Sequence, residues 1–281
     1  MRMKYRMFLV IFVFTLLTPM TQAQRGRPSR PIRGADFEAA LVRCSEVTVP
    51  TTLSNCGSDP LNWGTASINR QGKVQIKIFG AQPNVIYTAV YRSLDGSTER
   101  TLREIRTNAT GNANAELTGF FRFNDVGAGT VVLERENLDQ FLTGFIIEVL
   151  EPDEITQPNL EAGLVRCSEV NQPTTLSSCG TDRLLEGRAE IEQDVGVSEI
   201  EVRVAGAEPN TTYDVILRSP DAMTNVPIGT LTTDGRGLGK LEVENFFAPG
   251  TVGSGNIVLQ RNGLDQFITG FKVSQQTRGR R

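Results

Sequence analysis

The side chains of this chain that could carry out chemistry are its carboxylates and its cysteines, because the 281-residue sequence contains no histidine. The absence of histidine excludes Ser/His/Asp and Cys/His nucleophile systems, histidine general bases and every metal site that needs an imidazole. Pairs of Asp and Glu can still act as acid and base, as they do in glycoside hydrolysis. Any catalysis would therefore depend on carboxylates, and we predict that the protein is not an enzyme.

Six carboxylates recur at equivalent places in two related stretches of the chain. Three have simple structural explanations: Asp95 lies in an expected turn, Glu116 on the exposed face of an expected strand, and Asp139 is expected to cap a hairpin through its own backbone. An enzyme acting on sugars would also need aromatic platforms, and the chain has 1 Trp and 4 Tyr. The equivalent pairs are Glu38/Glu161, Glu46/Glu169, Asp59/Asp182, Asp95/Asp221, Glu116/Glu242 and Asp139/Asp265.

Calcium binding is a separate hypothesis for one of these pairs. Asp59 and Asp182 each follow a Cys-Gly-[Ser/Thr] sequence, so each lies in a loop that a disulfide would constrain. The chain has no Asp-x-Asp-x-Asp-Gly array of the kind that encloses Ca²⁺. We therefore predict no metal site and no cofactor.

The four cysteines predict two disulfides. Four cysteines allow three pairings, and the repetition of their spacing favours one bridge inside each stretch, Cys44 with Cys56 and Cys167 with Cys179. A zinc site would need close Cys-x-x-Cys pairs, which are absent from the sequence. A bridge that closes a loop near this size stabilises by about 3 kcal/mol in the chain-entropy model.

The elements that must position these residues come as one module used twice. Leu41–Val47 returns unchanged as 164–170, and Pro50–Ser54 as 173–177, at an offset of 123 residues. Later matches, such as 138–141 with 264–267, are offset by 126 residues, which places a three-residue insertion near 193–198. A self-similarity of this length indicates two repeats of about 115 residues each.

Apolar residues inside each repeat have a spacing of two, which predicts strands with one exposed face. The clearest inward-facing sets are Val74, Ile76, Ile78 and Ile200, Val202, Val204. Further alternating segments are 87–91, 113–117, 131–133 and 141–147, with counterparts at 213–217, 239–243, 257–259 and 267–273. Turn sequences separate these segments, and none of them has a helical stripe. We expect seven or eight antiparallel strands in each repeat.

The pattern Gly-Ala-x-Pro-Asn-x-x-Tyr occurs at 80–87 and 206–213, and each copy is followed later by Thr-x-x-x-Gly. This pattern resembles exported bacterial tandem β-sandwich repeat proteins of the immunoglobulin or fibronectin kind. The resemblance covers both repeats and implies a fold but no activity. The expected fold class is all-β, with two tandem antiparallel β-sandwich domains after a cleaved signal peptide.

Export is predicted by the first residues of the chain. A basic stretch (1–6) is followed by an apolar stretch of eleven residues (7–17) and by the small-residue site Thr21–Ala23. Eleven residues are too few to span a bilayer, which needs about 20, so we expect no membrane span. The predicted location is secreted or periplasmic.

The net charge of −3 conceals a strong segregation of charge. Seven of the 29 basic residues precede Ala35 and three follow Ser274, which leaves 19 against 32 acidic residues and a net charge of −13 for the body. A body this acidic argues against nucleic acid as a partner, because nucleic-acid binding depends on neutralising phosphates. We expect the basic ends to be flexible solubilising arms, with contact to anionic lipid, polysaccharide or an acidic partner as the alternative.

The predicted order of segments is a signal peptide (1–23), a basic flexible arm (24–36), β-sandwich repeat 1 (37–149), a linker (150–159), β-sandwich repeat 2 (160–274) and a basic tail (275–281). The linker assignment rests on its two prolines, its carboxylates and its lack of a periodic pattern.

The function predicted from these features is that of a non-enzymatic exported structural or interaction protein, with a cell-surface or extracellular protein or polysaccharide as partner. The alternative is a small-ligand protein with one equivalent glycan or calcium site in each repeat. The candidate recognition loop comprises Thr51, Thr52, Thr174 and Thr175, which the disulfides would hold in place. The competing and favoured explanation is that this loop is a lid, in which Leu53 and Leu176 cover the open end of each core.

Overall fold

The computed structural model describes residues 35–50, 53–147, 160–194 and 197–274. The predicted signal peptide, the linker and the basic tail lie outside these residues, as does nearly all of the basic arm. The described residues form β-strands and two short 3-10 turns, so the all-β class is confirmed. Within them, no helix is long and apolar enough to cross a membrane.

Each repeat contributes nine strands to the described part of the chain, more than the seven or eight expected from the sequence. Those of the first repeat are β1 (Ala35–Arg43), β2 (Trp63–Asn69), β3 (Val74–Phe79), β4 (Ile86–Ser93), β5 (Glu99–Arg106), β6 (Ala113–Leu117), β7 (Val126–Gly127), β8 (Gly129–Arg135) and β9 (Leu138–Ile146). Those of the second are β10 (Leu160–Arg166), β11 (Glu186–Asp194), β12 (Val197–Ala205), β13 (Thr212–Arg218), β14 (Asn225–Thr232), β15 (Gly239–Glu244), β16 (Val252–Ser254), β17 (Asn256–Arg261) and β18 (Leu264–Lys272). The 3-10 turns η1 (Cys44–Glu46) and η2 (Cys167–Glu169) follow the first strand of each repeat.

The period-two pattern of the sequence gives the correct faces of the strands. In β3 and β12, the six side chains expected to point inward are all at most 4% exposed. The polar residues between them are half-buried on the other face. A slip of one residue would move the whole apolar set into solvent, so burial fixes the register of these strands.

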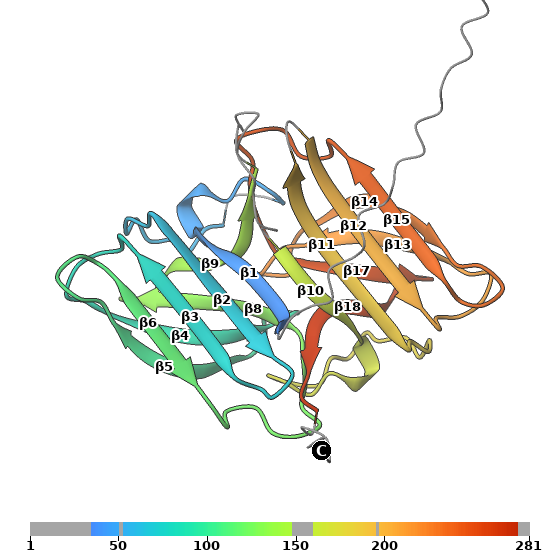
Figure 1. Ribbon diagram of the computed structural model, residues 1–281, viewed down its shortest axis with the longest axis horizontal. Helices are drawn as coiled ribbons and strands as arrows, with labels where there is room; N and C mark the ends of the chain where they lie inside the picture. Colours follow the sequence, from blue (N-terminus) through green and yellow to red (C-terminus); the bar gives the residue numbers. More distant parts are fainter. Residues whose placement is uncertain (1–34, 51–52, 148–159, 195–196, 275–281) are drawn as a thin grey trace, which may run out of the picture. The chain divides into compact units, whose positions relative to one another are not determined.

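One antiparallel sheet runs through the described parts of both repeats (Figure 1), and the strand pairings give it eight strands. Its order is β6-β3-β2-β1-β10-β11-β12-β15. The junction between the repeats is the pairing of β1 with β10, the first strands of the two repeats.

A second set of paired strands covers the inner face of the sheet in each repeat. Its order is β5-β4-β8-β9 in the first repeat and β14-β13-β17-β18 in the second. The last residues of β1 and β10 leave the eight-stranded sheet and pair with β9 and β18, so these two strands connect the layers. The arrangement is compatible with a β-sandwich.

The contacts between the repeats are reciprocal. In the pairing of β1 with β10, Glu38 lies opposite Glu161, which is its own counterpart in the second repeat. Strand β16 adds to β9 and, in the same way, β7 adds to β18. In an isologous interface each patch meets a copy of itself, and these pairings have that form. The predicted boundary within 150–159 lies outside the described residues, so the division into two domains stays a prediction.

Aromatic side chains join the cores of the two repeats. Phe271 of β18 packs against Phe121 and Tyr91 of the first repeat, with ring centroids 4.6 and 5.9 Å away. Phe145 of β9 packs in the equivalent way against Phe247 of the second repeat, at 4.7 Å. One continuous buried cluster therefore contains residues of both repeats.

Candidate functional site

The first candidate carboxylate, Asp59, is held inside the fold by a tyrosine and an arginine. The Tyr87 hydroxyl donates to Asp59 Oδ2 at 2.8 Å, and Arg135 Nη2 approaches Asp59 Oδ1 at 2.6 Å. Burial and then the hydrogen bond to Asp59 raise the pKa of Tyr87 above its usual range, so the phenol keeps its proton. Both oxygens of Asp59 thus have protein donors.

The second repeat contains the same buried network. Tyr213 donates to Asp182 at 2.9 Å, and Arg261 approaches the other oxygen of Asp182 at 2.6 Å. Burial and the hydrogen bond to Asp182 raise the pKa of Tyr213 as well. A carboxylate enclosed in this way has a structural role, since its charge is compensated and its lone pairs are used by the protein.

The segment from Cys56 to Asp59 packs against the side chain of Gln140. A Cβ at Gly57 would lie 2.0 Å from the amide group of Gln140, so a larger residue there would displace the buried Gln140 side chain. The same amide oxygen accepts a hydrogen bond from the Asp59 backbone N–H at 3.1 Å, and Gly180 and Gln266 repeat the arrangement in the second repeat. The Cys-Gly-x-Asp sequence therefore reflects packing around Gln140, and this geometry gives no support to a calcium loop.

Asp139 corrects one expectation drawn from the sequence. The expected hairpin cap through its own backbone is wrong, because the buried carboxylate of Asp139 accepts two hydrogen bonds from Arg92, at 2.6 and 2.9 Å. Asp265 is bound in the same forked way by Arg218. By contrast, Asp95 accepts from Ser97 N at 3.1 Å in a turn, and Glu116 is exposed on its strand, as expected.

The surroundings of the two Arg–Asp forks differ between the repeats. Around Arg92, the side chains of Glu99 and Glu134 approach the guanidinium at 2.5 and 3.2 Å, and with Asp139 they form what we call the Arg92 cage. Around Arg218 the equivalent positions are Asn225 and Gln260. The first repeat therefore has three carboxylates around one arginine, and the second repeat has one.

A cavity of about 290 Å³ opens beside the Arg92 cage. Its lining includes Arg92, Glu99 and Asp139 of the cage and, from the second repeat, Pro220 and Asp221. Another cavity, of about 300 Å³, lies by β10 and β18 of the second repeat. It is lined in part by Leu185 and Glu186, whose first-repeat counterparts are Asn62 and Trp63. Because these lining residues differ between the repeats, this second cavity is not a ligand site shared by both repeats.

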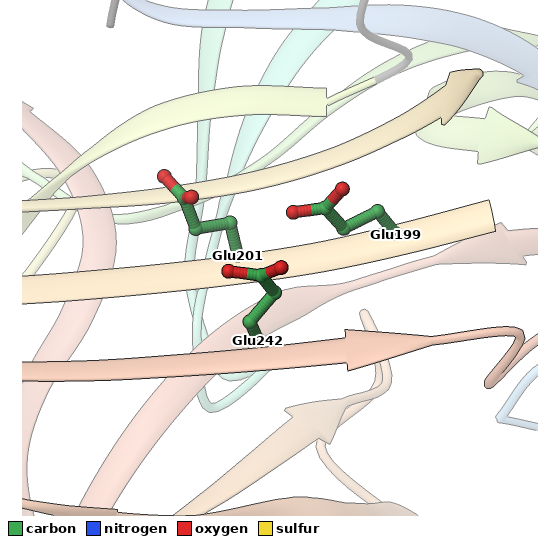
Figure 2. A group of neighbouring side chains, drawn as sticks. All are labelled: Glu199, Glu201 and Glu242. Carbon is green, nitrogen blue, oxygen red and sulfur yellow. The ribbon is translucent and has the colours of Figure 1, made fainter. Parts of the chain in front are cut away.

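The remaining carboxylate group lies on the outer face of the eight-stranded sheet. Figure 2 shows Glu199 and Glu201 on one strand, β12, and Glu242 on the neighbouring strand, β15. One oxygen from each of the three lies within 4.8 Å of the others, a geometry that could hold a cation. Of these three, only Glu242 belongs to the carboxylate pairs that recur between the repeats. The signal in the sequence for the other two is the alternating Glu-x-Glu of β12.

The first repeat has no such trio at the equivalent place. The counterparts of Glu199, Glu201 and Glu242 are Lys73, Gln75 and Glu116. Lys73 forms an ion pair with Glu116 at 2.8 Å. The acidic trio is therefore a property of the second repeat and does not repeat with the fold.

The trio belongs to a longer row of glutamates that crosses five strands. In the pairing of β1, β10, β11, β12 and β15, each glutamate lies directly opposite the next; the row is Glu38, Glu161, Glu190, Glu201 and Glu242. Like charges directly opposite each other on a sheet are destabilising. Three basic side chains of the second repeat, Arg188, Arg203 and Lys240, offset part of this repulsion by forming ion pairs with the last four glutamates of the row. Burial, together with neighbouring carboxylates, raises the pKa of Glu161, Glu190 and Glu199, although the Arg188 guanidinium opposes the rise at the first two.

The outer face of the first repeat has a different chemistry. Trp63 stacks on Phe79 across β2 and β3, with ring centroids 4.0 Å apart, and Trp63 is half exposed. Glu186 and Ala205 occupy the equivalent positions in the second repeat. The two halves of this face thus differ in charge and in apolar character, while the buried Tyr–Asp–Arg networks of the two repeats are the same.

The predicted disulfides are both present, with Cα atoms 5.2 Å apart in each. All four cysteines are paired, and two disulfides fit an oxidising compartment. Of the candidate recognition residues, Thr51 and Thr52 lie outside the described residues, while Thr174 is half-buried and Thr175 exposed.

Leu53 and Leu176 pack against small buried clusters beside the bridges, which are separate from the main core cluster, so the lid also stays a prediction. The role of the loop in recognition stays a prediction.

Comparison with known proteins adds no family to this description. No protein-family model matches the chain, and no curated protein matches it. The resemblance to exported immunoglobulin-like or fibronectin-like repeats therefore stays at the level of an all-β chain with a large antiparallel sheet.

Proposed function

We propose that the protein is a non-enzymatic exported structural or interaction protein that offers the outer face of its eight-stranded sheet to a positively charged partner at or outside the cell surface. The observation that carries the proposal is the row of five directly opposed glutamates across both repeats. The row has five carboxylates, and three basic side chains, Arg188, Arg203 and Lys240, form ion pairs with four of them. A cationic partner would neutralise the negative charge that these three side chains leave.

The buried carboxylates support the non-enzymatic part of the proposal. A catalytic acid or base must reach a substrate, whereas Asp59, Asp139 and their counterparts are buried and bound to tyrosine or arginine side chains. The alternative of one equivalent glycan or calcium site per repeat has less support, because the acidic trio occurs in one repeat only. Export rests on the signal sequence and the two disulfides.

Binding of the full chain to immobilised poly-L-lysine tests the proposal. The variant with Glu199→Gln, Glu201→Gln and Glu242→Gln should bind more weakly than the wild type, and the difference should shrink as salt is added. The matched control neutralises three exposed carboxylates away from this face, Glu104→Gln, Glu136→Gln and Asp214→Asn.

If both triple variants lose the same affinity, binding follows net charge alone and the outer face is not the docking surface. A calcium titration by calorimetry tests the alternative. Two equivalent sites would support one site per repeat. Binding heat that disappears in the Glu199/Glu201/Glu242 triple variant but remains in the control variant would support a single cation on the trio.

A further inference from the structure

The Arg92 cage contains more negative charge than its single arginine can balance. Arg92 lies on β4, and the three carboxylates come from three other strands: Glu99 from β5, Glu134 from β8 and Asp139 from β9. Asp139 is buried and Glu134 has a side-chain exposure of 23%, so water screens these charges only in part. One cation among three carboxylates leaves two negative charges in a partly dry site.

The second repeat shows how the same geometry is satisfied without the extra charge. Gln260, the counterpart of Glu134, donates from Nε2 to Asp265 Oδ1 at 2.7 Å. Asn225, the counterpart of Glu99, accepts from Arg218 Nε at 3.1 Å. A protonated Glu134 has the shape and the donor capacity of Gln260, so it can make the equivalent bond to a neighbouring carboxylate. An ionised Glu134 cannot donate this bond.

Burial is the main reason that the pKa of Glu134 is raised, followed by the charges of Glu99 and Asp139, while Arg92 opposes the rise. The charged groups that face Glu134 are therefore Arg92 on β4, Glu99 on β5 and Asp139 on β9. Its chain neighbour Arg135 is directed instead to Asp59.

The cage also forms part of the contact between the repeats. Asp221, in the turn after β13, lines the same cavity as Arg92, Glu99 and Asp139. The backbone of this turn lies close to Gly96 of the first repeat, since a Cβ at Gly96 would be 3.4 Å from Asp221 C. Two carboxylates of the cage, Glu99 and Asp139, therefore share a cavity with an acidic residue of the second repeat.

We propose that the Arg92 cage is a proton-binding switch that controls how firmly the first repeat holds the Pro220–Asp221 turn of the second. With a proton on Glu134, the cage reproduces the hydrogen bonds of the second repeat and the turn is held. Without it, the negative charge on Glu134 adds to that of Glu99 and Asp139, which line the cavity together with Asp221, and the repulsion across the cavity loosens the turn. This switch is independent of the outer sheet face and of any partner there.

The stability of the full chain between pH 4 and pH 8 tests the proton site. A group whose pKa is raised on folding stabilises below its unfolded pKa, about 4.3 for Glu, and that contribution is lost as pH rises through the folded pKa. The difference in unfolding midpoint between Glu134→Gln and the wild type should therefore be smallest near pH 4 and should grow in favour of the variant as pH rises. A difference that is constant across this range overturns the proposal.

The reciprocal substitution in the second repeat is the matched control. Gln260→Glu should introduce a loss of stability with rising pH beside Arg218. This loss should be smaller than the one at Glu134, because the neighbouring Asn225 carries no charge. If Gln260→Glu fails to fold, the carboxyl ¹³C titration of Glu134 in the wild-type protein decides the question. A midpoint at the ordinary value for Glu contradicts the proton site.

Hydrogen exchange tests the coupling to the turn. The Met223 and Thr224 amides are bonded to Asp221 and Ser219 within the turn, at 3.1 and 3.0 Å. Comparing the wild type with Glu134→Gln at each pH cancels the intrinsic pH dependence of exchange. Exchange in the wild type should become faster than in the variant as pH rises, and a constant ratio overturns the coupling.

Discussion

Replacing Phe271 by Ala should destabilise both repeats together, because the ring lies in the second repeat and packs on the first. Phe271 is fully buried and contacts Phe121 and Tyr91 across the junction. A buried aromatic side chain covers about 150–250 Å², which corresponds to about 4–6 kcal/mol at about 25 cal/mol per Å². Measured Phe→Ala losses are about 3–5 kcal/mol, and we expect this value.

The single tryptophan makes the measurement specific to one repeat. Trp63 lies on β2 of the first repeat, so its fluorescence reports the unfolding of that repeat, while far-UV circular dichroism reports all strands. If the repeats unfold as one cooperative unit, both signals should show one transition and both should shift. At about 2–4 °C per kcal/mol for a unit of this size, the shift in Tm is roughly 6–20 °C.

A second variant separates cooperativity from direct contact. Ile200 is fully buried on β12, which pairs with β11 and β15 inside the second repeat. Ile200→Ala should cost about 2–5 kcal/mol and should also move the Trp63 transition. The reasoning is refuted if either variant lowers a circular-dichroism transition while the Trp63 midpoint stays where it is in the wild type.

Three further outcomes follow from the described contacts. Tyr87→Phe removes one of the two donors to buried Asp59 and should cost about 1–3 kcal/mol in urea unfolding, and no loss would show that Arg135 alone satisfies the carboxylate. Gly57→Ala forces a Cβ to within 2.0 Å of the Gln140 side chain and should cost about 1–3 kcal/mol, so an unchanged urea midpoint would contradict the fit described there. Replacing the Cys44–Cys56 bridge with two serines should cost about 3 kcal/mol, and a cross-repeat disulfide peptide in non-reducing mass spectrometry would contradict the pairing itself.

The sequence by itself determined the strands and their inward faces. The alternation in 74–78 and 200–204 predicted β3 and β12 with the correct buried residues, because burial of one face of a sheet selects period-two patterns. The repeated spacing of the cysteines predicted both bridges, since the same local chain geometry brings the two sulfurs together in each repeat.

The sequence also indicated which carboxylates recur, but not what they do. Asp59 and Asp139 each lie far along the chain from the arginine that binds them, Arg135 and Arg92. Nothing in the local pattern indicates such a pairing, so the turn and loop around each Asp suggested a calcium loop or a hairpin cap instead. Equivalence between the repeats marked these residues as important, and only their neighbours in space show that they stabilise the fold.

The tertiary structure alone decided how the repeats combine and where the acidic row lies. Glu38 and Glu161 face each other because β1 pairs with β10 in a reciprocal register, and this register extends a row of glutamates over five strands. Pairing between strands from different repeats depends on edges and core surfaces that come together only when both repeats are folded. The order of residues along the chain fixes which side of each strand is polar, whereas the packing of one repeat against the other fixes which polar residues become neighbours.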